Sequence, residues 1–391
     1  APILSAHRLG SVARLLELGQ VSVSPATNAA ERYFSGDDAR VLFIGSPLHS
    51  DLGPGDAGGG LYGLVMMGLA QQVGMPVALG GAQSISDALV RMILSLGGQI
   101  LTNQRVDRVM MRNNRVVGVE AAGVEIRTRR AVLATLPPTL LFGRLIEPDL
   151  LPASFMRAVK GFRWGSGVFK LDLALGSMPR FNAESLNGAG VLHLGRTSLA
   201  LTAAVHQVKD QLLPAAPPLI AGLHTLADPT RAPVGCHTLW IETHVPSQPL
   251  GDAAEHLTDC DWDSLREPFA ERLIDELSIF SPDVRSCILD YYAQTPKDLE
   301  AANANLVGGD IAGGSYTIDQ QLVFRPIAGW FRHAMPIKGL YLGGASAHPG
   351  GGVHGGAGAN AARVLLQDLK LKSLDESVRN GLRQLRGWVM P

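Results

Sequence analysis

The sequence predicts a mixed fold in which an α/β portion is interleaved with an α+β portion, and three observations lead to this prediction. A short strand at 340–342 runs through a glycine-rich loop into a helix of small residues over 355–369. An amphipathic helix and a β-meander occupy 84–135. Strands and long helices without a βαβ rhythm occupy about 150–335, which is typical of an α+β domain.

The first half of the chain is expected to be mainly helical before the meander. Helices are predicted around Leu9–Leu18 and over 61–73, and the apolar stretch 41–44 resembles a strand. A further helix over 84–96 has apolar residues at the 3.6-residue period and is ended by a glycine pair. Asn113–Asn114 then predicts a tight hairpin turn, since asparagine tolerates positive φ. Strands are expected on either side of this turn, at 100–109, 115–120, 124–128 and 131–135.

Alternating apolar and polar residues predict half-buried strands in the second half of the chain. The clearest alternation covers 168–175, and 191–194 and 239–245 are similar. Phe269, Leu273, Leu277 and Phe280 mark an amphipathic helix, which is expected to begin near Pro268.

Composition excludes several classes of protein. The chain has 34 basic and 35 acidic side chains, so its net charge of −1 argues against nucleic-acid binding. Three cysteines, each more than twenty residues from the next, form no disulfide framework and favour the cytoplasm. The most apolar stretch, 61–70, is about half the roughly 20 residues that a membrane span requires. Low charge remains compatible with peripheral membrane contact, and the oligomeric state stays open.

The strand, glycine loop and helix near the C-terminus have the composition of a site for an electron-rich group. Six glycines fall within nine residues, at positions 350, 351, 352, 355, 356 and 358. Glycines let a planar ligand approach the main chain, and a helix start presents unpaired amides and a partial positive charge. A glycine-rich connector in a tight core is the structural alternative.

Three segments resemble the phytoene-desaturase-like flavoproteins, within the amine oxidase and carotenoid desaturase superfamily. They are Pro76–Leu89 with Gly97–Val109, then Asn305–Asp310 with Asp319–Gln321 and Phe324–Pro326, and finally Leu340–Val353, which is close to the family's C-terminal FAD signature. The resemblance implies FAD as cofactor and hydride transfer from an apolar small-molecule substrate. It also implies a partial Rossmann-like, three-layer FAD/NAD(P)-binding domain, interleaved with a mixed-sheet substrate domain.

The resemblance also implies domain boundaries and site residues. The substrate domain would comprise a helical segment at 1–75 and the residues 146–335, the FAD-binding domain 76–145 and 336–370, and a C-terminal helix or tail 371–391. The cofactor-binding residues would be Val106, Ala134, Thr135, Gly343, Gly344, Gly351, Gly352, Val353, His354, Gly355, Gly356 and Asn360. His348 and Arg325 are the candidate catalytic side chains.

One departure from the family concerns the dinucleotide-binding turn. Flavoproteins of this kind open with a strand, a Gly-x-Gly-x-x-Gly turn and a helix. Gly53–Gly58 matches that pattern literally, but the strand-like stretch before it ends too early. The chain is therefore expected to be the C-terminal part of a longer flavoprotein, to bind FAD weakly or not at all, and to be inactive by itself.

The sequence leaves two other functions open and contains one other cluster of candidate ligands. An amine-oxidase-like enzyme would need an aromatic cage, for which Trp330, Phe331 and Tyr341 are the nearby candidates. A flavin-free ligand-binding or assembly domain is the non-enzymatic alternative. Glu242 and His244 share one strand face with His237 nearby, but two side chains at i and i+2 do not make a zinc site. A solvated strand face and no metal site are predicted there.

Overall fold

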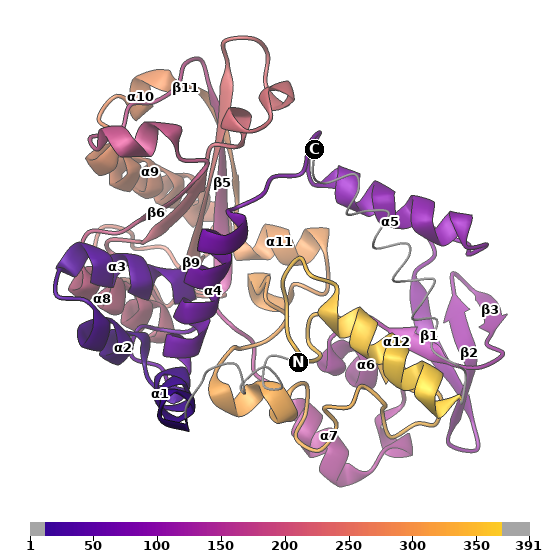
Figure 1. Cartoon of the computed structure of the whole chain (residues 1–391). Helices are drawn as coiled ribbons and strands as arrows, with labels where there is room; N and C mark the ends of the chain where they lie inside the picture. Colours follow the sequence, from indigo (N-terminus) through magenta and orange to yellow (C-terminus); the bar gives the residue numbers. More distant parts are fainter. Residues whose placement is uncertain (1–11, 370–391) are drawn as a thin grey trace. The chain divides into compact units, whose positions relative to one another are not determined.

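The computed structural model describes residues 12–369, and contacts divide the chain into two units. Within the described residues, unit 1 comprises Val12–Leu101, Trp164–Ile311 and Ser315–Ile318, and unit 2 comprises Thr102–Arg163, Ala312–Gly314 and Asp319–Leu369. The predicted tail at 371–391 lies outside the described residues. The mixed α/β class that the sequence predicts is confirmed by several sheets with helices around them (Figure 1).

Unit 1 contains a five-stranded sheet in the order β11-β5-β9-β8-β6, in which every neighbouring pair is antiparallel. β5, β6 and β9 confirm the strands predicted from alternation, and β8 and β11 were not predicted. Their bounds are β5 (Gly167–Leu175), β6 (Val191–Leu194), β8 (Leu219–Gly222), β9 (His237–Val245) and β11 (Ile288–Gln294). A separate parallel pair joins β7 (Leu212–Leu213) to β10 (Gly251–Asp252).

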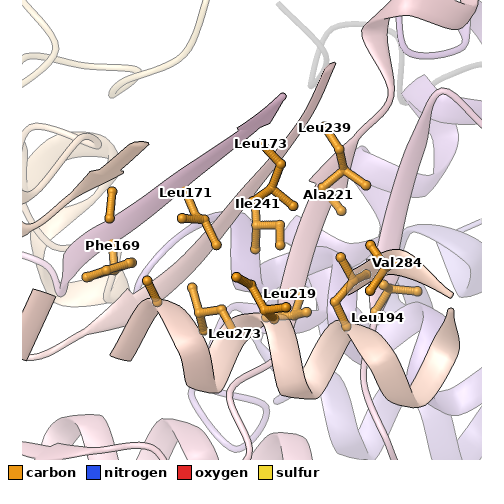
Figure 2. Close-up of a cluster of buried hydrophobic side chains, with 14 of the residues drawn as sticks. Phe169, Leu171, Leu173, Leu194, Leu219, Ala221, Leu239, Ile241, Leu273 and Val284 are labelled. Atoms are coloured by element: carbon orange, nitrogen blue, oxygen red, sulfur yellow. The ribbon is translucent and has the colours of Figure 1, made fainter. Parts of the chain in front are cut away.

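Helix α9 (Trp262–Phe280) covers one face of this sheet. Figure 2 shows Phe169 and Leu171 of β5 and Ile241 of β9 pointing toward Leu273 of the helix, and all four are buried. The predicted start near Pro268 is wrong, because the helix begins six residues earlier at Trp262. Proline has no amide hydrogen to donate, but its fixed φ is helical, and the packing of Trp262 and Leu265 into the core outweighs the lost bond.

The remaining helices of unit 1 include most of the N-terminal region. Residues 41–44, predicted as a strand, belong to helix α3, because Phe43 and Ile44 pack into a helical cluster rather than a sheet. The predicted helix over 61–73 is confirmed as α4, and that over 84–96 as α5. The helices are α1 (Val12–Val23), α2 (Ala26–Tyr33), α3 (Asp37–Gly45), α4 (Gly59–Val73), α5 (Gln83–Ser95), α8 (Ser198–Lys209), α10 (Val284–Cys287) and α11 (Pro296–Ala302).

Unit 2 contains the predicted meander. Strands β1 (Val106–Arg112), β2 (Arg115–Ala121) and β3 (Val124–Arg127) form an antiparallel sheet in this order. Asn113 and Asn114 connect β1 to β2 with φ of 51° and 54°, as the sequence predicts for this turn. The predicted first strand at 100–109 begins later, at Val106, and continues to the turn.

The second sheet of unit 2 is the one that positions the candidate site. Strands β4 (Val132–Ala134) and β12 (Leu340–Leu342) pair in parallel, although more than 200 residues separate them in the sequence. Helix α12 (Gly356–Asp368) follows β12, and α6 (Pro138–Arg144) and α7 (Ala153–Lys160) complete the unit. Leu340, Leu342, Leu141, Phe142 and Phe155 are buried in its core.

Short 3-10 helices lie in the connections of both units, at η2 (Ser46–His49), η3 (Pro148–Leu150), η4 (Glu184–Gly188), η5 (His224–Leu226), η6 (Pro229–Arg231), η7 (Val307–Gly309), η8 (Ile318–Gln320) and η9 (Leu322–Phe324). Within residues 12–369, every helix is too short or too polar to cross a bilayer.

Candidate functional site

The ends of β4 and β12 bring four of the predicted cofactor residues together. The Gly343 amide donates to the Ala134 carbonyl at 2.8 Å, which extends the parallel pairing by one residue. A Cβ at Gly344 would lie 2.2 Å from the Thr135 carbonyl oxygen, closer than any real contact. Only glycine therefore lets the two chains approach this closely.

Helix α12 packs directly against this crossing point. A Cβ at Gly343 would lie 3.0 Å from the Ala361 Cβ and 3.4 Å from the Gly358 Cα. The small residues of the helix, noted in the sequence, thus allow the helix to pack close to the strand end. Consequently the strand, the glycine loop and the helix form one compact turn.

The N-terminal end of α12 is open to solvent. Gly355 is the N-cap in a left-handed conformation, with φ of 61°, and no atom would lie within 4 Å of a Cβ there. Residues 352–355 are exposed, Val353 by 90%, and Gly352 has a φ of 130°. The Gly356 amide donates to His354 Nδ1 at 2.9 Å. The other amides of the first turn have no acceptor within the helix, as at every helix start. This end can therefore accept an anionic or electron-rich group.

Arg325 lies inside unit 2, fully buried, rather than on the surface of a cleft. Its guanidinium donates to the carbonyls of Ala312 and Ala345 at 3.1 Å and to that of Gly313 at 3.0 Å. A Cβ at Gly351 would lie 2.5 Å from the Ala312 carbonyl oxygen. Arg325 thus holds the 312–314 segment against the glycine loop. The hydrogen bonds of this candidate catalytic residue therefore go to backbone carbonyls of the protein.

His348 is half-buried in the same loop, and its Nδ1 has no protein partner. Burial lowers the pKa of His348, and the neighbouring His333 and Arg325 lower it further. His348 is accordingly neutral at pH 7 and can offer one donor and one acceptor to a ligand. His333, whose Nδ1 lies 2.9 Å from the Leu342 carbonyl oxygen, was not singled out in the sequence, because no local pattern marks it.

Val106 and Asn360 lie farther from the crossing point along the chain. Val106 opens β1 opposite Ala121 and is 36% exposed. The sheet of β1 is joined to the second sheet by the Val116 amide, which donates to the Lys338 carbonyl at 3.0 Å. The Asn360 side chain accepts from Arg363 Nη1 at 2.9 Å on the exposed side of α12.

The aromatic side chains near the loop are engaged in packing. The Tyr341 hydroxyl donates to Asp368 at 2.9 Å, and burial together with this carboxylate raises the pKa of Tyr341 to about 12. The Trp330 ring meets Phe155 edge to face, with ring centroids 5.5 Å apart. Phe331 is 38% exposed.

Unit 1 also contains a histidine cluster, which the sequence did not reveal. His49 Nε2 lies 2.7 Å from His193 Nε2, and His244 lies close enough to His49 to affect its charge. The solvated strand face predicted for Glu242 and His244 is wrong, because both side chains are half-buried and line a pocket together with residues of α8. This burial raises the pKa of Glu242 and lowers that of His244. Among the described residues, however, no three His, Cys, Asp or Glu side chains are arranged to hold a metal ion.

The literal glycine pattern at Gly53–Gly58 is a loop that leads into α4. Helix α3 and the 3-10 helix η2 precede it, so it has no strand before it. The prediction that it is not a dinucleotide-binding turn is therefore consistent with its position between helices.

Comparison with known proteins relates the chain to flavoproteins. Residues 24–180 match the family "Flavin containing amine oxidoreductase". The chain is 30% identical over 387 residues to rat pyridine nucleotide-disulfide oxidoreductase domain-containing protein 2, covering 94% of this chain and 65% of the rat protein. It is 28% identical to one of the subunits of limonene dehydrogenase from Castellaniella defragrans, over 75% of this chain and 55% of that protein. It is 26% identical to a lycopene-forming phytoene desaturase of Paracoccus, over 93% of this chain and 71% of that enzyme.

Solved structures agree with these relatives on the fold. An oxidoreductase from Methanosarcina mazei superposes with a TM-score of 0.57 at 18% identity, covering 91% of this chain and 71% of that one. Cyclohexylamine oxidase from Brevibacterium oxydans gives a TM-score of 0.50 at 14% identity, covering 90% and 69%. The chain is therefore similar in part of its sequence to the flavin-containing amine oxidoreductases, and over most of its length to a phytoene desaturase at 26% identity.

Proposed function

We propose that the chain belongs to an FAD-dependent oxidoreductase that removes a hydride from an apolar substrate. One observation carries the proposal, namely the glycine-only crossing of β4 and β12 that leads into the exposed start of α12. The relatives named above support the flavin, and the limonene and phytoene enzymes among them support an isoprenoid-like substrate.

The residues at the crossing fit a flavin on physical grounds. A side chain at Gly344 or Gly351 would collide with a backbone carbonyl, so these two glycines hold the loop closely packed, and the main chain is open to a ligand at the exposed residues 352–355. The start of α12 adds a partial positive charge, which favours the negative charge that reduced flavin carries. Residues 343–344 and 352–356 would hold the cofactor through backbone amides.

FAD would supply the hydride acceptor, and the chain's own residues would bind and orient it. Arg325 fixes the 312–314 segment against the loop through three carbonyls. His348, neutral at pH 7, can donate or accept one hydrogen bond beside the loop without adding charge. Hydride transfer from a C–H bond needs no side-chain base, so the proposal does not depend on His348 as a proton acceptor.

The experiment is anaerobic bleaching of FAD absorbance at 450 nm by the chain with excess FAD. Limonene, a phytoene suspension and cyclohexylamine are offered in turn. Free FAD is reduced by none of them, so bleaching reports hydride transfer that depends on the chain. Weak FAD binding is the reason for which the chain alone is expected to be inactive, and the excess of FAD is supplied to fill the site. Under this condition we expect bleaching with an isoprenoid and none with the amine, since Trp330 and Tyr341 are engaged in packing. Bleaching by the amine alone would support the amine-oxidase-like alternative, and bleaching by none would remove the proposed activity from this chain.

Gly352→Val tests the ring-facing loop by FAD fluorescence quenching. We expect at least a tenfold loss of FAD affinity, because a branched side chain at this exposed position blocks approach to the main chain. Gly329→Val is the control for the cost of a positive φ, since Gly329 has a φ of 85°; it has open space around it, whereas a Cβ at Gly352 would lie 2.9 Å from the ring of His354. Equal affinity in Gly352→Val and the native chain would remove Gly352 from the site.

A further inference from the structure

The outer edge of β12 is paired by a loop of unit 2 rather than by a strand. One edge of β12 pairs with β4. At the other edge, Ala334 lies opposite Tyr341 in an antiparallel bridge, and the Leu342 amide donates to the His333 carbonyl at 2.9 Å. The loop therefore follows β12 as far as Leu342, the last residue of the strand.

A side chain completes this pairing at the end of β12. In a regular antiparallel ladder, two facing residues of a hydrogen-bonded pair exchange both of their N–H···O=C bonds. Leu342 and His333 make the first of these bonds through their backbones, and His333 Nδ1 lies 2.9 Å from the Leu342 carbonyl oxygen. The φ of His333 is 67°, in the left-handed region, which turns its own amide out of the ladder. The imidazole thus takes the place of a backbone amide.

This contact determines which ring nitrogen of His333 carries a proton. A carbonyl oxygen only accepts hydrogen bonds, so Nδ1 is the donor. His333 is 4% exposed and Leu342 is fully buried, so water cannot replace the imidazole at this carbonyl. Without the imidazole the carbonyl would lose its partner, which is costly for a buried backbone group.

The peptide plane between Leu342 and Gly343 is held at both of its ends. Its carbonyl accepts from His333 Nδ1, and its amide, which belongs to Gly343, donates to the Ala134 carbonyl at 2.8 Å. The C=O and N–H groups of a trans peptide point in opposite directions, so the two bonds together oppose rotation of the plane. Rotation would otherwise be easy here, because Gly343 has no Cβ to restrict its φ.

This plane is the last one before the glycine crossing of the candidate cofactor site. Gly343 and Gly344 follow it, and a Cβ at Gly344 would lie 2.2 Å from the Thr135 carbonyl oxygen. A rotated plane would change the direction of the glycine amides and displace this close approach. A left-handed backbone at a residue other than glycine persists where its surroundings fix it, and such residues are enriched at functional sites.

We propose that His333 is a positioning residue of the cofactor site, whose Nδ1–H holds the Leu342–Gly343 peptide plane and thereby orients the amides of Gly343 and Gly344 for FAD. The inference rests on the proposed function for the identity of the ligand. The hydrogen bond itself is a property of the chain without FAD, so it can be tested separately.

Three variants of His333 separate the donor from the ring and from the backbone conformation. His333→Asn keeps a donor, because asparagine Nδ2 is bonded to Cγ as histidine Nδ1 is, and asparagine tolerates positive φ. His333→Gly tolerates positive φ but has no donor. His333→Phe keeps a ring of similar size but has no donor. His206→Phe, at an exposed histidine of α8, is the control and should behave as the native chain does.

FAD affinity is measured by fluorescence quenching with FAD in excess. We expect His333→Gly and His333→Phe each to lose about tenfold in affinity, and His333→Asn to remain within about threefold of the native chain, since one buried hydrogen bond distinguishes them. Equal affinity in all the chains, or an equal loss in all three His333 variants, would overturn the role of the donor. Far-UV circular dichroism checks that each variant folds.

Two measurements without FAD distinguish failure of this inference from failure of the proposed function. Amide hydrogen exchange over 340–344 should be about tenfold faster in His333→Gly and His333→Phe and unchanged in His333→Asn, because the lost bond lets the strand end open. In the native chain with ¹⁵N-labelled histidine, the His333 signal, identified by its loss in His333→Asn, should show a proton on Nδ1.

Unchanged exchange in His333→Gly and His333→Phe, or a neutral His333 ring protonated only on Nε2, would overturn the inference whatever the FAD titrations show. Exchange rates as expected in a native chain that binds no FAD would confirm that His333 holds the peptide plane, and would overturn the proposed function instead.

Discussion

At the scale of single residues, the candidate site depends on glycines that meet two kinds of backbone requirement. Gly344 and Gly351 lie against backbone carbonyls, whereas Gly355 adopts a left-handed conformation in open space. These are two different physical requirements, close approach and positive φ. The sequence indicated that glycines cluster here, and the structure distinguishes which requirement each one meets.

Gly344→Ala is expected to lower the free energy of unfolding by about 1–3 kcal/mol, the usual cost of overpacking. Its Cβ would lie 2.2 Å from the Thr135 carbonyl oxygen, so β12 must shift away from β4. Urea unfolding measures the change. Gly143→Ala, an exposed glycine of α6 with open space, serves as the control and should lose less than about 0.5 kcal/mol. Equal stability of the two variants would contradict the close approach.

At the scale of elements, ion pairs join segments that packing alone does not fix. Arg272 of α9 donates to both carboxylate oxygens of Asp252 in β10 at 2.6 Å, and to the Pro214 carbonyl at 3.1 Å. The Asp252 side chain is 1% exposed. The pair therefore holds the small β7–β10 sheet against α9.

Acid titration tests this ion pair. Burial alone would raise the pKa of Asp252, but hydrogen bonds from Arg272 and from the Leu257 and Ala254 amides lower it to about 2. A depressed carboxyl pKa stabilises the fold above the unfolded value near 3.8, and this stabilisation is lost as the pH falls toward 2. Asp252→Asn should therefore cost about 2 kcal/mol at pH 7 and weaken the pH dependence of unfolding between pH 4 and 2.

Urea midpoints measured at pH 7, 4, 3 and 2 provide the comparison. Asp210→Asn, an exposed aspartate at the end of α8, is the control and should follow the native curve. If Asp252→Asn lost as much stability as the native chain between pH 4 and 2, the acid dependence would come from other groups.

At the scale of the whole molecule, each unit is assembled from segments that are distant in the sequence. Unit 2 joins residues 102–163 to the segments that begin at Ala312 and Asp319, and the β4–β12 pairing makes that connection. The chain spans 65% of the length of its rat relative. The candidate cofactor site therefore depends on a tertiary contact, and the activity of the longer relatives is a proposal for this chain.

The affinity of the chain for FAD is expected to be low. The pyrophosphate of FAD is usually held by a glycine turn between a strand and a helix, and Gly53–Gly58 lies between helices instead. Chain purified by gel filtration without added FAD should show no absorbance at 450 nm. Stoichiometric FAD retained through that step would contradict this prediction.

The sequence alone determined the elements whose pattern is local. The Asn113–Asn114 hairpin, the alternating strands, β12 and α12 were all predicted from periodicity and turn chemistry, and so was the glycine loop. Local patterns mispredict the secondary structure where packing against residues distant in the sequence decides it. Residues 41–44 became helical because Phe43 and Ile44 join a helical cluster, and α9 continued through Pro268.

Only the tertiary structure decided which polar groups meet. His49, His193 and His244 are far apart in the chain, and they come together because the sheet and its helices fold against each other. The same holds for Arg325, whose burial against backbone carbonyls no sequence pattern expresses. The physical reason is that periodicity and turn chemistry act over a few residues. The burial and hydrogen bonding of these side chains depend instead on segments more than a hundred residues away, or on loops that only the folded chain brings into contact.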